Sequence, residues 1–440
     1  MFELIAPYLF LLPPFFIIRK KHNNFHDLIK EISKSWLFFW SYYVLLGVSI
    51  LIFIPKNFNP VFVFTLTLIL YSYLKKDFIQ TSYKLLSNQF LIFMLFFIIS
   101  LTNEKLQISG DTIWSFVLSL DITVTNPNNI KFTLLGHRPI ALPLISSLSV
   151  SAFKQIFFQF NIFTFLLLFF RFGSLLFIMI NKNINNKLIS FIAIATFLTS
   201  PVLLSLSFYW GNHLFIALGF LELILFFDNN LKHQNNIDFF ILSSSLIFFR
   251  REVFLFIIIF FVYFVKKINK NYSLITFLLP IFWFLNLYFL EIPLQKSETL
   301  QFLLISLIMI LFLIFYNFVN IRIFYSKLFI FLVLTAAHLV LIHLYGFTFW
   351  EIFYKNLLGL GGWGIIGTLM LFAIIGMPLI KRNITSLTTI IILTFQVLPY
   401  VNDQSGDGWR FGFTSSFNRI LYYLLPIIIY EFLKEINNED

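Results

Sequence analysis

The sequence predicts an all-α protein that crosses a membrane many times. Of its 440 residues, 59% are apolar and only 12% are charged, and the mean hydropathy is +0.88. Soluble domains average about 25% charged residues. Many apolar runs approach the roughly 20 residues that a helix needs to cross a bilayer, and they exceed the alternating segments of about ten residues in outer-membrane barrels. Because backbone groups in lipid must hydrogen-bond internally, the crossings are expected to be helices.

The apolar runs predict about 13–15 transmembrane helices, with interfacial helices in the first large outer loop. Segment 2–18 lacks a small-residue cleavage site, so we expect a retained helix there rather than a removable signal peptide. The expected helices lie near residues 2–18, 36–54, 60–74, 90–102, 161–180, 188–206, 213–227, 238–249, 252–265, 273–290, 300–319, 328–345, 361–380, 384–400 and 420–433.

Cysteine content and net charge exclude several classes of function. The chain has no cysteine, which excludes disulfides, thiolate metal sites and cysteine nucleophiles. A net charge of +11 would point to nucleic acid in a soluble protein. In a membrane protein the same excess is explained by cytoplasmic loops, which collect Lys and Arg. We therefore expect the lipid bilayer, and no nucleic acid, among the partners.

The distribution of Lys and Arg predicts the orientation of the chain. When the predicted helices alternate across the membrane, one set of loops holds 19 Lys and Arg and the other holds 11 in much more sequence. The positive-inside rule makes the first set cytoplasmic and places loop 103–160 outside. This holds only if segment 139–158 does not cross. Its two prolines, several serines and one lysine favour a helix lying in the interface, and a crossing there would reverse the charge bias.

Charged residues from three distant segments are predicted to lie on this outer side. The first segment contains "SGDTIWSF" (109–116) and "GHRPIALPL" (136–144), the second is the turn "FFRREVF" (248–254), and the third is "NDQSGDGWRFGFTSSFNR" (402–419). Charged groups near a bilayer are costly and often functional. The candidate residues are Asp111, His137, Arg138, Arg250, Arg251, Glu252, Asp407, Arg410 and Arg419.

This set of residues suits the transfer of a group from a phosphate carrier. A carboxylate such as Asp111 can act as general base on an acceptor hydroxyl. Arginines can hold a phosphate by paired, charge-assisted hydrogen bonds. Phosphate is already a good leaving group, so neutralising its charge matters more than protonating it.

The order of these motifs resembles the GT-C integral-membrane glycosyltransferases, especially the dolichyl-phosphate-mannose–protein mannosyltransferase-like group. "SGDTIWSF" resembles the Gly-Asp-Glu-like acid of the first outer loop, and "GHRPIALPLISSL" resembles the His-Pro-Pro-Leu-like motif that follows. "FRREVFLF" resembles an Arg-Pro-Glu-like turn between two later helices. "TSPVLLSLSFYW" (199–210) resembles a Ser-Pro ahead of the second outer loop, and "FNRILYYLLPIII" (417–429) a later Arg-helix-Pro element.

The resemblance implies a catalytic region over residues 90–433, including loop 103–160, after N-terminal membrane helices in 1–89 and before a cytoplasmic tail, 434–440. It implies a polyprenyl-phosphate-linked sugar as donor, a glycan, lipid or protein as acceptor, Asp111 as base, and inversion at the anomeric carbon. The expected location is a prokaryotic inner membrane, with the active site facing outside.

The chain also departs from the family pattern. Thr112 stands where a Glu often follows the acid, and the second outer loop offers Asn212 and His213 where the family often has an acid. The sequence therefore leaves open whether a divalent cation, Mg²⁺ or Mn²⁺, takes part.

Each candidate residue also has a structural interpretation. Asp111 could cap a helix, His137 and Arg138 could anchor an interfacial helix by snorkelling, and Arg250, Arg251 and Glu252 could end two helices and pair with one another. Two other classes of function remain open. They are an O-antigen polymerase or ligase-like enzyme, and a lipid-linked sugar flippase or transporter, which would need polar groups at mid-membrane.

Two further features carry structural predictions. Arg171 lies inside the apolar run "LFFRFGSLL", where a buried charge needs a partner. The run "GLGGWGIIG" (359–367) lacks the lysine and strand context of a phosphate loop and predicts close helix packing. Trp363, within that run, fits anchoring at a membrane interface.

Overall fold

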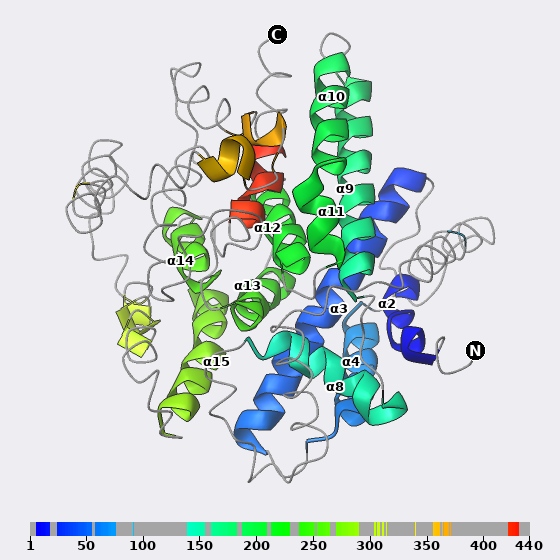
Figure 1. Cartoon of the computed structure of the whole chain (residues 1–440). Helices are drawn as coiled ribbons and strands as arrows, with labels where there is room; N and C mark the ends of the chain where they lie inside the picture. Colours follow the sequence, from blue (N-terminus) through cyan, green and yellow to red (C-terminus); the bar gives the residue numbers. More distant parts are fainter. Residues whose placement is uncertain are drawn as a thin grey trace. The chain divides into compact units, whose positions relative to one another are not determined.

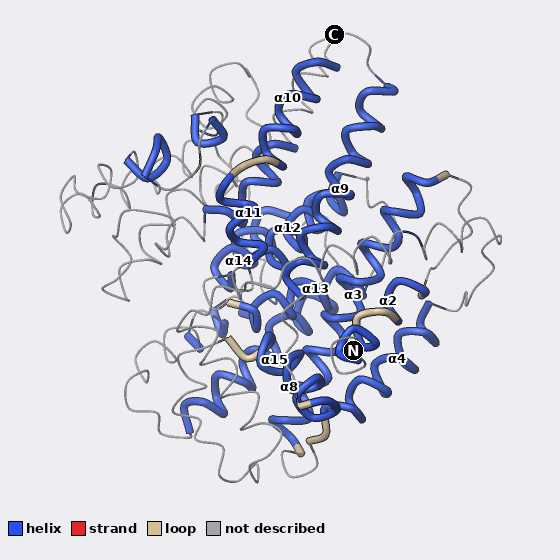
Figure 2. The backbone as a smooth tube through the Cα atoms, turned by 45° about the vertical axis from the view of Figure 1, so that its right-hand side comes forward, coloured by secondary structure: helices blue, strands red, loops and turns tan. Residues whose placement is uncertain are grey.

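The chain is almost entirely helical wherever its structure is described, and no strand occurs among those residues (Figure 2). The predicted all-α class is therefore confirmed for this part of the chain. The computed structural model describes residues 6–17, 24–54, 58–75, 91, 139–154, 160–182, 187–208, 213–228, 237–250, 253–264, 270–289 and 421–430, together with scattered positions between 303 and 370.

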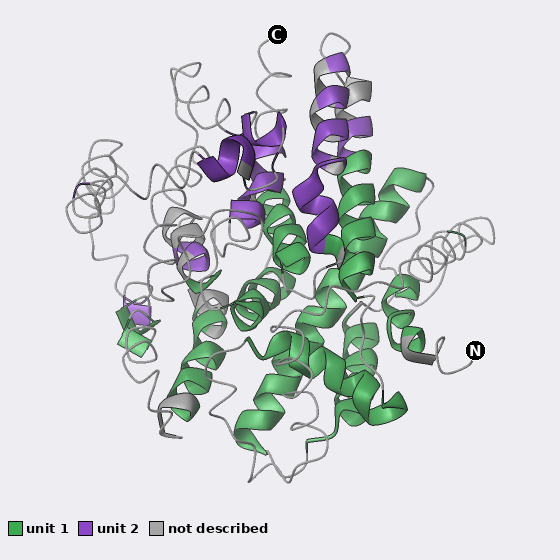
Figure 3. Cartoon of the chain, in the orientation of Figure 1, with its two compact units in different colours: residues 1–174, 207–254, 271–308 green, residues 175–206, 255–270, 309–440 purple. Residues whose placement is uncertain are grey.

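The chain forms two compact units, each built from separate stretches of sequence (Figure 3). The first unit contains residues 1–174, 207–254 and 271–308, and the second contains residues 175–206, 255–270 and 309–440. The boundary that we predict at residue 89 stays a prediction, because residues 76–90 lie outside the described part.

The first unit is built around helix α3 (Phe25–Phe53), against which several of the other described helices pack (Figure 1). These neighbours cover α3 along most of its length, and 16 of its residues, between Leu28 and Leu51, are buried. Its neighbours are α2 (Pro13–Phe16), α4 (Pro60–Lys75), α8 (Ala141–Phe153), α12 (His213–Asp228) and α13 (Ile237–Phe249).

Aromatic side chains form much of the core around α3. The ring of Trp36 lies 4.9 Å from that of Phe160, at the start of α9 (Phe160–Lys182), and the ring of Trp40 lies 5.7 Å from the same phenylalanine. On α12 and α13, Phe215 stacks on Phe249 with ring centroids 4.0 Å apart. Such pairs stabilise a core by about 0.5–1.5 kcal/mol each beyond the area that they bury.

Local signals set several helix boundaries. Pro60 opens α4, where the side-chain oxygen of Asn59 accepts hydrogen bonds from the backbone N–H groups of Val61 (2.9 Å) and Phe62 (3.2 Å). An asparagine cap followed by proline is a favoured helix start. Helix α8 ends at Phe153, because the next residue, Lys154, adopts a left-handed backbone conformation (φ 54°).

Most predicted helices in the described part are confirmed, within a few residues at each end. They are α4, α9, α12, α13, α14 (Val253–Phe264), α15 (Lys270–Phe289) and the helical segment Leu421–Tyr430. Residues 90–102 and most of residues 300–400 lie outside the described part, so the helices expected there stay predictions.

Three predicted helices were wrong in their extent. Segment 2–18 is interrupted, over its described residues, between a short 3-10 helix (η1, Ala6–Phe10) and α2, because the Pro13–Pro14 pair starts a new helix. Segment 188–206 is two helices, α10 (Lys187–Leu198) and α11 (Pro201–Phe208). The helix expected over 36–54 begins eleven residues earlier, at Phe25, because α3 continues through a more polar stretch ahead of its apolar part.

Helix α8 corresponds to the segment that we expected to lie in the membrane interface. It has 13 residues, too few to cross a bilayer. Its first ten residues, Ala141–Val150, are all buried, in contact with α3, α4, α13 and η1. The hydroxyl of Tyr43, on α3, donates a hydrogen bond of 3.0 Å to the carbonyl of Leu144, on α8. This burial differs from that of an interfacial helix, which exposes one face.

Two helices among the described residues are long and apolar enough to cross a membrane, Phe25–Phe53 and Phe160–Phe177. Both are largely buried within the chain, as the core helices of soluble proteins also are.

The second unit contains the glycine-rich run that predicts close packing. A Cβ atom placed on Gly367 would lie 1.8 Å from the carbonyl oxygen of Leu357, in the π-helix η5 (Asn356–Leu360), so only glycine fits there. The packing prediction is confirmed at this residue, while a Cβ atom placed on Gly359 would have no neighbour within 4 Å. Trp363 is completely buried, so its predicted role as an interface anchor was wrong. It fills the core beside Gly367 instead.

Candidate functional site

One of the predicted outer-face residues, Arg250, lies in the described part of the chain. It follows α13 and is half-buried. Its N–H donates to the carbonyl of Leu246 (3.4 Å), and its carbonyl accepts from the N–H of Val253 (3.2 Å), the first residue of α14. The predicted end of one helix and start of the next at this point are confirmed.

The other predicted site residues lie outside the described part, so their approach to one another stays a prediction. They are Asp111, His137, Arg138, Arg251, Glu252, Asp407, Arg410 and Arg419.

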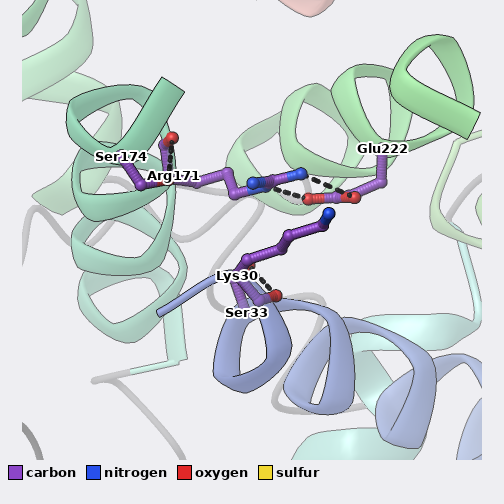
Figure 4. Close-up of polar contacts among 5 residues, drawn as sticks. All are labelled: Lys30, Ser33, Arg171, Ser174 and Glu222. Carbon is purple, nitrogen blue, oxygen red and sulfur yellow. Dashed lines mark hydrogen bonds and ion pairs between the residues drawn. The ribbon is translucent and has the colours of Figure 1, made fainter. Parts of the chain in front are cut away.

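A different polar site is visible inside the first unit, where Arg171 on α9 meets Glu222 on α12 (Figure 4). The Nε atom of Arg171 donates to one carboxylate oxygen at 2.5 Å, and the Nη2 atom donates to the other at 3.4 Å. Both side chains are 2% exposed. The expectation that Arg171 needs a buried partner is confirmed, and the partner is Glu222.

This ion pair holds together two helices that are far apart in sequence. A planar guanidinium donates both hydrogen bonds to one carboxylate, which fixes the orientation as well as the distance of the two side chains. Removing either partner would leave a buried charge without compensation, at a cost of about 3–5 kcal/mol. Glu222 was not among the sequence candidates. The available signal was a single acid within the apolar run "FLELILFF" (220–227), which needs a partner for the same reason as Arg171.

Lys30, from the second turn of α3, extends its side chain toward the carboxylate of Glu222 (Figure 4). Lys34 lies one turn further along the same helix. In the described part of the chain, the ammonium group of Lys30 takes part in no ion pair or hydrogen bond. Three helices, α3, α9 and α12, therefore bring charged groups to one place in an apolar unit.

A second buried carboxylate lies on α13. Asp238 is 5% exposed, and its Oδ1 atom accepts a hydrogen bond of 3.0 Å from the hydroxyl of Tyr42 on α3. The ring of Tyr71 on α4 lies 5.5 Å from that of Tyr42. A hydrogen bond to a charged group contributes about 1.5–3 kcal/mol. This contact therefore helps to hold α13 on α3.

The described residues do not form a metal site from side chains. Among them, no group of three or more His, Cys, Asp or Glu side chains is placed to hold a metal ion. Chemically, the Arg171–Glu222 pair links α9 to α12, and the Lys30 side chain is directed at the same carboxylate (Figure 4).

Comparisons with known proteins leave the family open. No protein-family model matches the chain, and no match is found among curated proteins or among solved structures. The similarity to GT-C glycosyltransferases therefore rests on the order of the motifs in the sequence.

Proposed function

We propose that the protein is a polytopic membrane glycosyltransferase of the GT-C type. It transfers a sugar from a polyprenyl-phosphate carrier to an acceptor hydroxyl at the outer face of the membrane, with inversion. The observation that carries the proposal is the ordered set of polar motifs assigned to one side of a very apolar chain, from "SGDTIWSF" through "GHRP" and "FRRE" to "FNR".

About 13–15 transmembrane helices are part of this proposal. Its support is the agreement between apolar runs and helices: α4, α9, α12, α13, α14 and α15 each coincide with one run. Helices shorter than a full crossing are compatible with a polytopic fold when they are buried among other helices, because neighbours then satisfy the backbone groups at their ends.

The proposed reaction places Asp111 beside the acceptor. Its carboxylate takes the proton of the acceptor hydroxyl, whose oxygen attacks the anomeric carbon of the sugar. The bond between that carbon and the carrier phosphate breaks, and the bonding pair leaves with the phosphate. His137, Arg138, Arg250, Arg251, Arg410 and Arg419 are the candidates to hold the phosphate charge. Glu252 and Asp407 would orient these cations.

Transfer activity is the test of this proposal. The purified full-length protein would be supplied with a panel of radiolabelled polyprenyl-phosphate sugars and native-membrane acceptors. Because a general base contributes about 10²–10⁴-fold to a rate, Asp111→Asn should lower transfer by at least about 100-fold. It should leave expression and thermal stability unchanged.

Asp121→Asn is the matched control, because Asp121 is an acid of the same loop for which we expect no catalytic role. Its transfer rate should stay close to that of the wild type. Wild-type turnover by Asp111→Asn would remove this residue from the role of base and leave helix capping as its explanation. Failure of the folded wild-type protein to release sugar from any carrier would count against the enzyme itself.

A transporter for lipid-linked sugars is the second candidate, and the buried polar groups of the first unit favour it. Besides the Arg171–Glu222 pair and Asp238, Ser146 and Ser149 on α8 and Ser244 on α13 are buried, and their hydroxyls have no hydrogen-bond partner in the described part of the chain. Transporters place such polar groups within the membrane. Uptake of labelled carrier-linked sugar into proteoliposomes without covalent change would select this candidate.

A further inference from the structure

Helix α4 carries apolar side chains on its exposed face as well as on its buried face (Figure 1). Its buried residues include Phe64 and Tyr71, whose rings lie 5.4 Å and 5.9 Å from that of Phe39 on α3. The opposite face exposes six large side chains, which are Val61, Phe62, Ile69, Leu70, Tyr73 and Leu74. A helix between a core and water has a polar outer face, whereas a helix that is apolar all round is covered on every side. The outer face of α4 therefore needs a partner.

No charge interrupts this outer face. The sequence has no Asp, Glu, Lys or Arg between Lys56 and Lys75. Helix α4 has 16 residues and is therefore about 24 Å long. Ile69, near its middle, is 61% exposed, and Tyr73, near its end, is 69% exposed. A continuous apolar surface of this kind marks an interaction site for another protein or for a membrane.

Polar groups on the outer face are satisfied by the helix itself. The exposed hydroxyl of Thr65 donates a hydrogen bond of 2.9 Å to the carbonyl of Val61. At the start of the helix, the side-chain oxygen of Asn59 accepts hydrogen bonds from the N–H groups of Val61 and Phe62. Lipid tails offer no hydrogen bonds, so a surface that faces them must pair its polar groups internally. Helix α4 meets this requirement at Thr65 and at its first turn.

The size of the exposed side chains distinguishes lipid from a second helix as the partner. Helices that pack against one another in a membrane have small residues where they meet. Between residues 60 and 74, which the structure describes, Thr65 is the one small residue of the exposed face. Phe62, Ile69 and Leu70 would hold the backbone of a second helix away, whereas flexible acyl chains can fill the spaces between such side chains.

We infer that the outer face of α4 is in contact with the fatty-acyl chains of a bilayer. Tyr73 then lies at the level of the headgroups, where aromatic side chains are favoured. Lys75 and Lys76 follow it at the end that the positive-inside rule makes cytoplasmic. The inference rests on the membrane location in the proposed function and identifies a lipid-covered face of one helix. It does not depend on sugar transfer.

The same kind of surface occurs on α15. Leu278 and Phe282 are one turn apart on this helix, and both are exposed. The ring of Phe282 lies 5.7 Å from that of Phe53, the last residue of α3, which is also exposed. Acyl chains are a suitable partner for this surface as well.

The test uses the absence of cysteine from the chain. Ile69→Cys in the full-length protein would carry a nitroxide label in phosphatidylcholine nanodiscs, and Phe62→Cys would give an independent reading on the same face. Asn24→Cys is the control, because Asn24 is exposed ahead of α3 and its side chain makes no capping hydrogen bond. Power saturation measures how often each label collides with oxygen, which concentrates in lipid, and with a nickel chelate, which stays in water. The thermal midpoint of each variant checks that it is folded.

We expect the ratio of oxygen to nickel collisions to be several-fold higher at Ile69 and Phe62 than at Asn24. Nickel collisions as frequent at Ile69 as at Asn24 would place α4 in water and overturn the inference. Few collisions with both reagents would show that protein covers this face, either a second copy or another part of the chain, and would also overturn it. Lipid contact at Ile69 in a protein that releases sugar from no carrier would leave this inference standing and count against the proposed enzyme alone.

Discussion

At the scale of single residues, the Arg171–Glu222 pair shows how a buried charge is tolerated in an apolar unit. The guanidinium donates two hydrogen bonds to the carboxylate, and both side chains are 2% exposed, so neither keeps its hydration shell. Their mutual attraction offsets this loss only while both are present. The pair therefore makes the contact between α9 and α12 specific, rather than making it strong.

Single and double substitutions should distinguish these two effects. Glu222→Leu leaves the guanidinium of Arg171 buried without a counter-charge and should lower the free energy of unfolding by about 3–5 kcal/mol. Combining it with Arg171→Met replaces both charges by apolar groups and should recover most of the loss. Denaturant unfolding in detergent, followed by tryptophan fluorescence, measures both. Equal losses in the single and double variants would contradict this account.

At the scale of helices, the close approach of α12 and α13 depends on a glycine. A Cβ atom on Gly219 would lie 2.7 Å from Cδ2 and 3.0 Å from Cδ1 of Leu246, so a side chain there must displace that leucine. Gly173, in the middle of α9, has nothing within 4 Å of the same position. The two glycines are alike in sequence context, because each lies inside an apolar helix.

We expect opposite outcomes from substituting these two glycines. Gly219→Val should destabilise the protein by about 1–3 kcal/mol, because it overpacks the contact with Leu246. Gly173→Ala should stabilise it by about 0.5–1 kcal/mol, because alanine has the higher helix propensity and meets no neighbour. The measurement is the thermal midpoint of each purified variant, at matched detergent concentration. Destabilisation by Gly173→Ala would contradict the open space of at least 4 Å around a Cβ atom at this residue.

At the scale of the whole molecule, the proposed topology puts loop 103–160 outside and the start of α3 inside. The orientation rests on the uneven distribution of Lys and Arg between two sets of loops. A chain without cysteine makes this arrangement directly accessible to labelling.

Single cysteines should report the two sides. Asn126→Cys, in the predicted outer loop, should react with a membrane-impermeant maleimide in intact cells. Asn235→Cys, in a predicted cytoplasmic loop, should react only after the cells are permeabilised. The cysteine-free wild type gives the background of the assay. Labelling of both variants in intact cells, or the reverse pattern, would contradict the orientation and with it the outer location of Asp111.

Within the described part of the chain, the sequence by itself determined the helical class and most helix positions, because hydropathy and turn residues act over short stretches of chain. It also indicated that Arg171 needs a partner and that the glycine-rich run 359–367 packs closely, which the structure bears out at Gly367. The tertiary structure decided that Glu222 is the partner, that Lys30 joins it, and that α8 and Trp363 are buried. These facts depend on how helices far apart in sequence pack against one another. The pattern of apolar residues shows which face of a helix is buried, but it does not specify which other helix packs against that face.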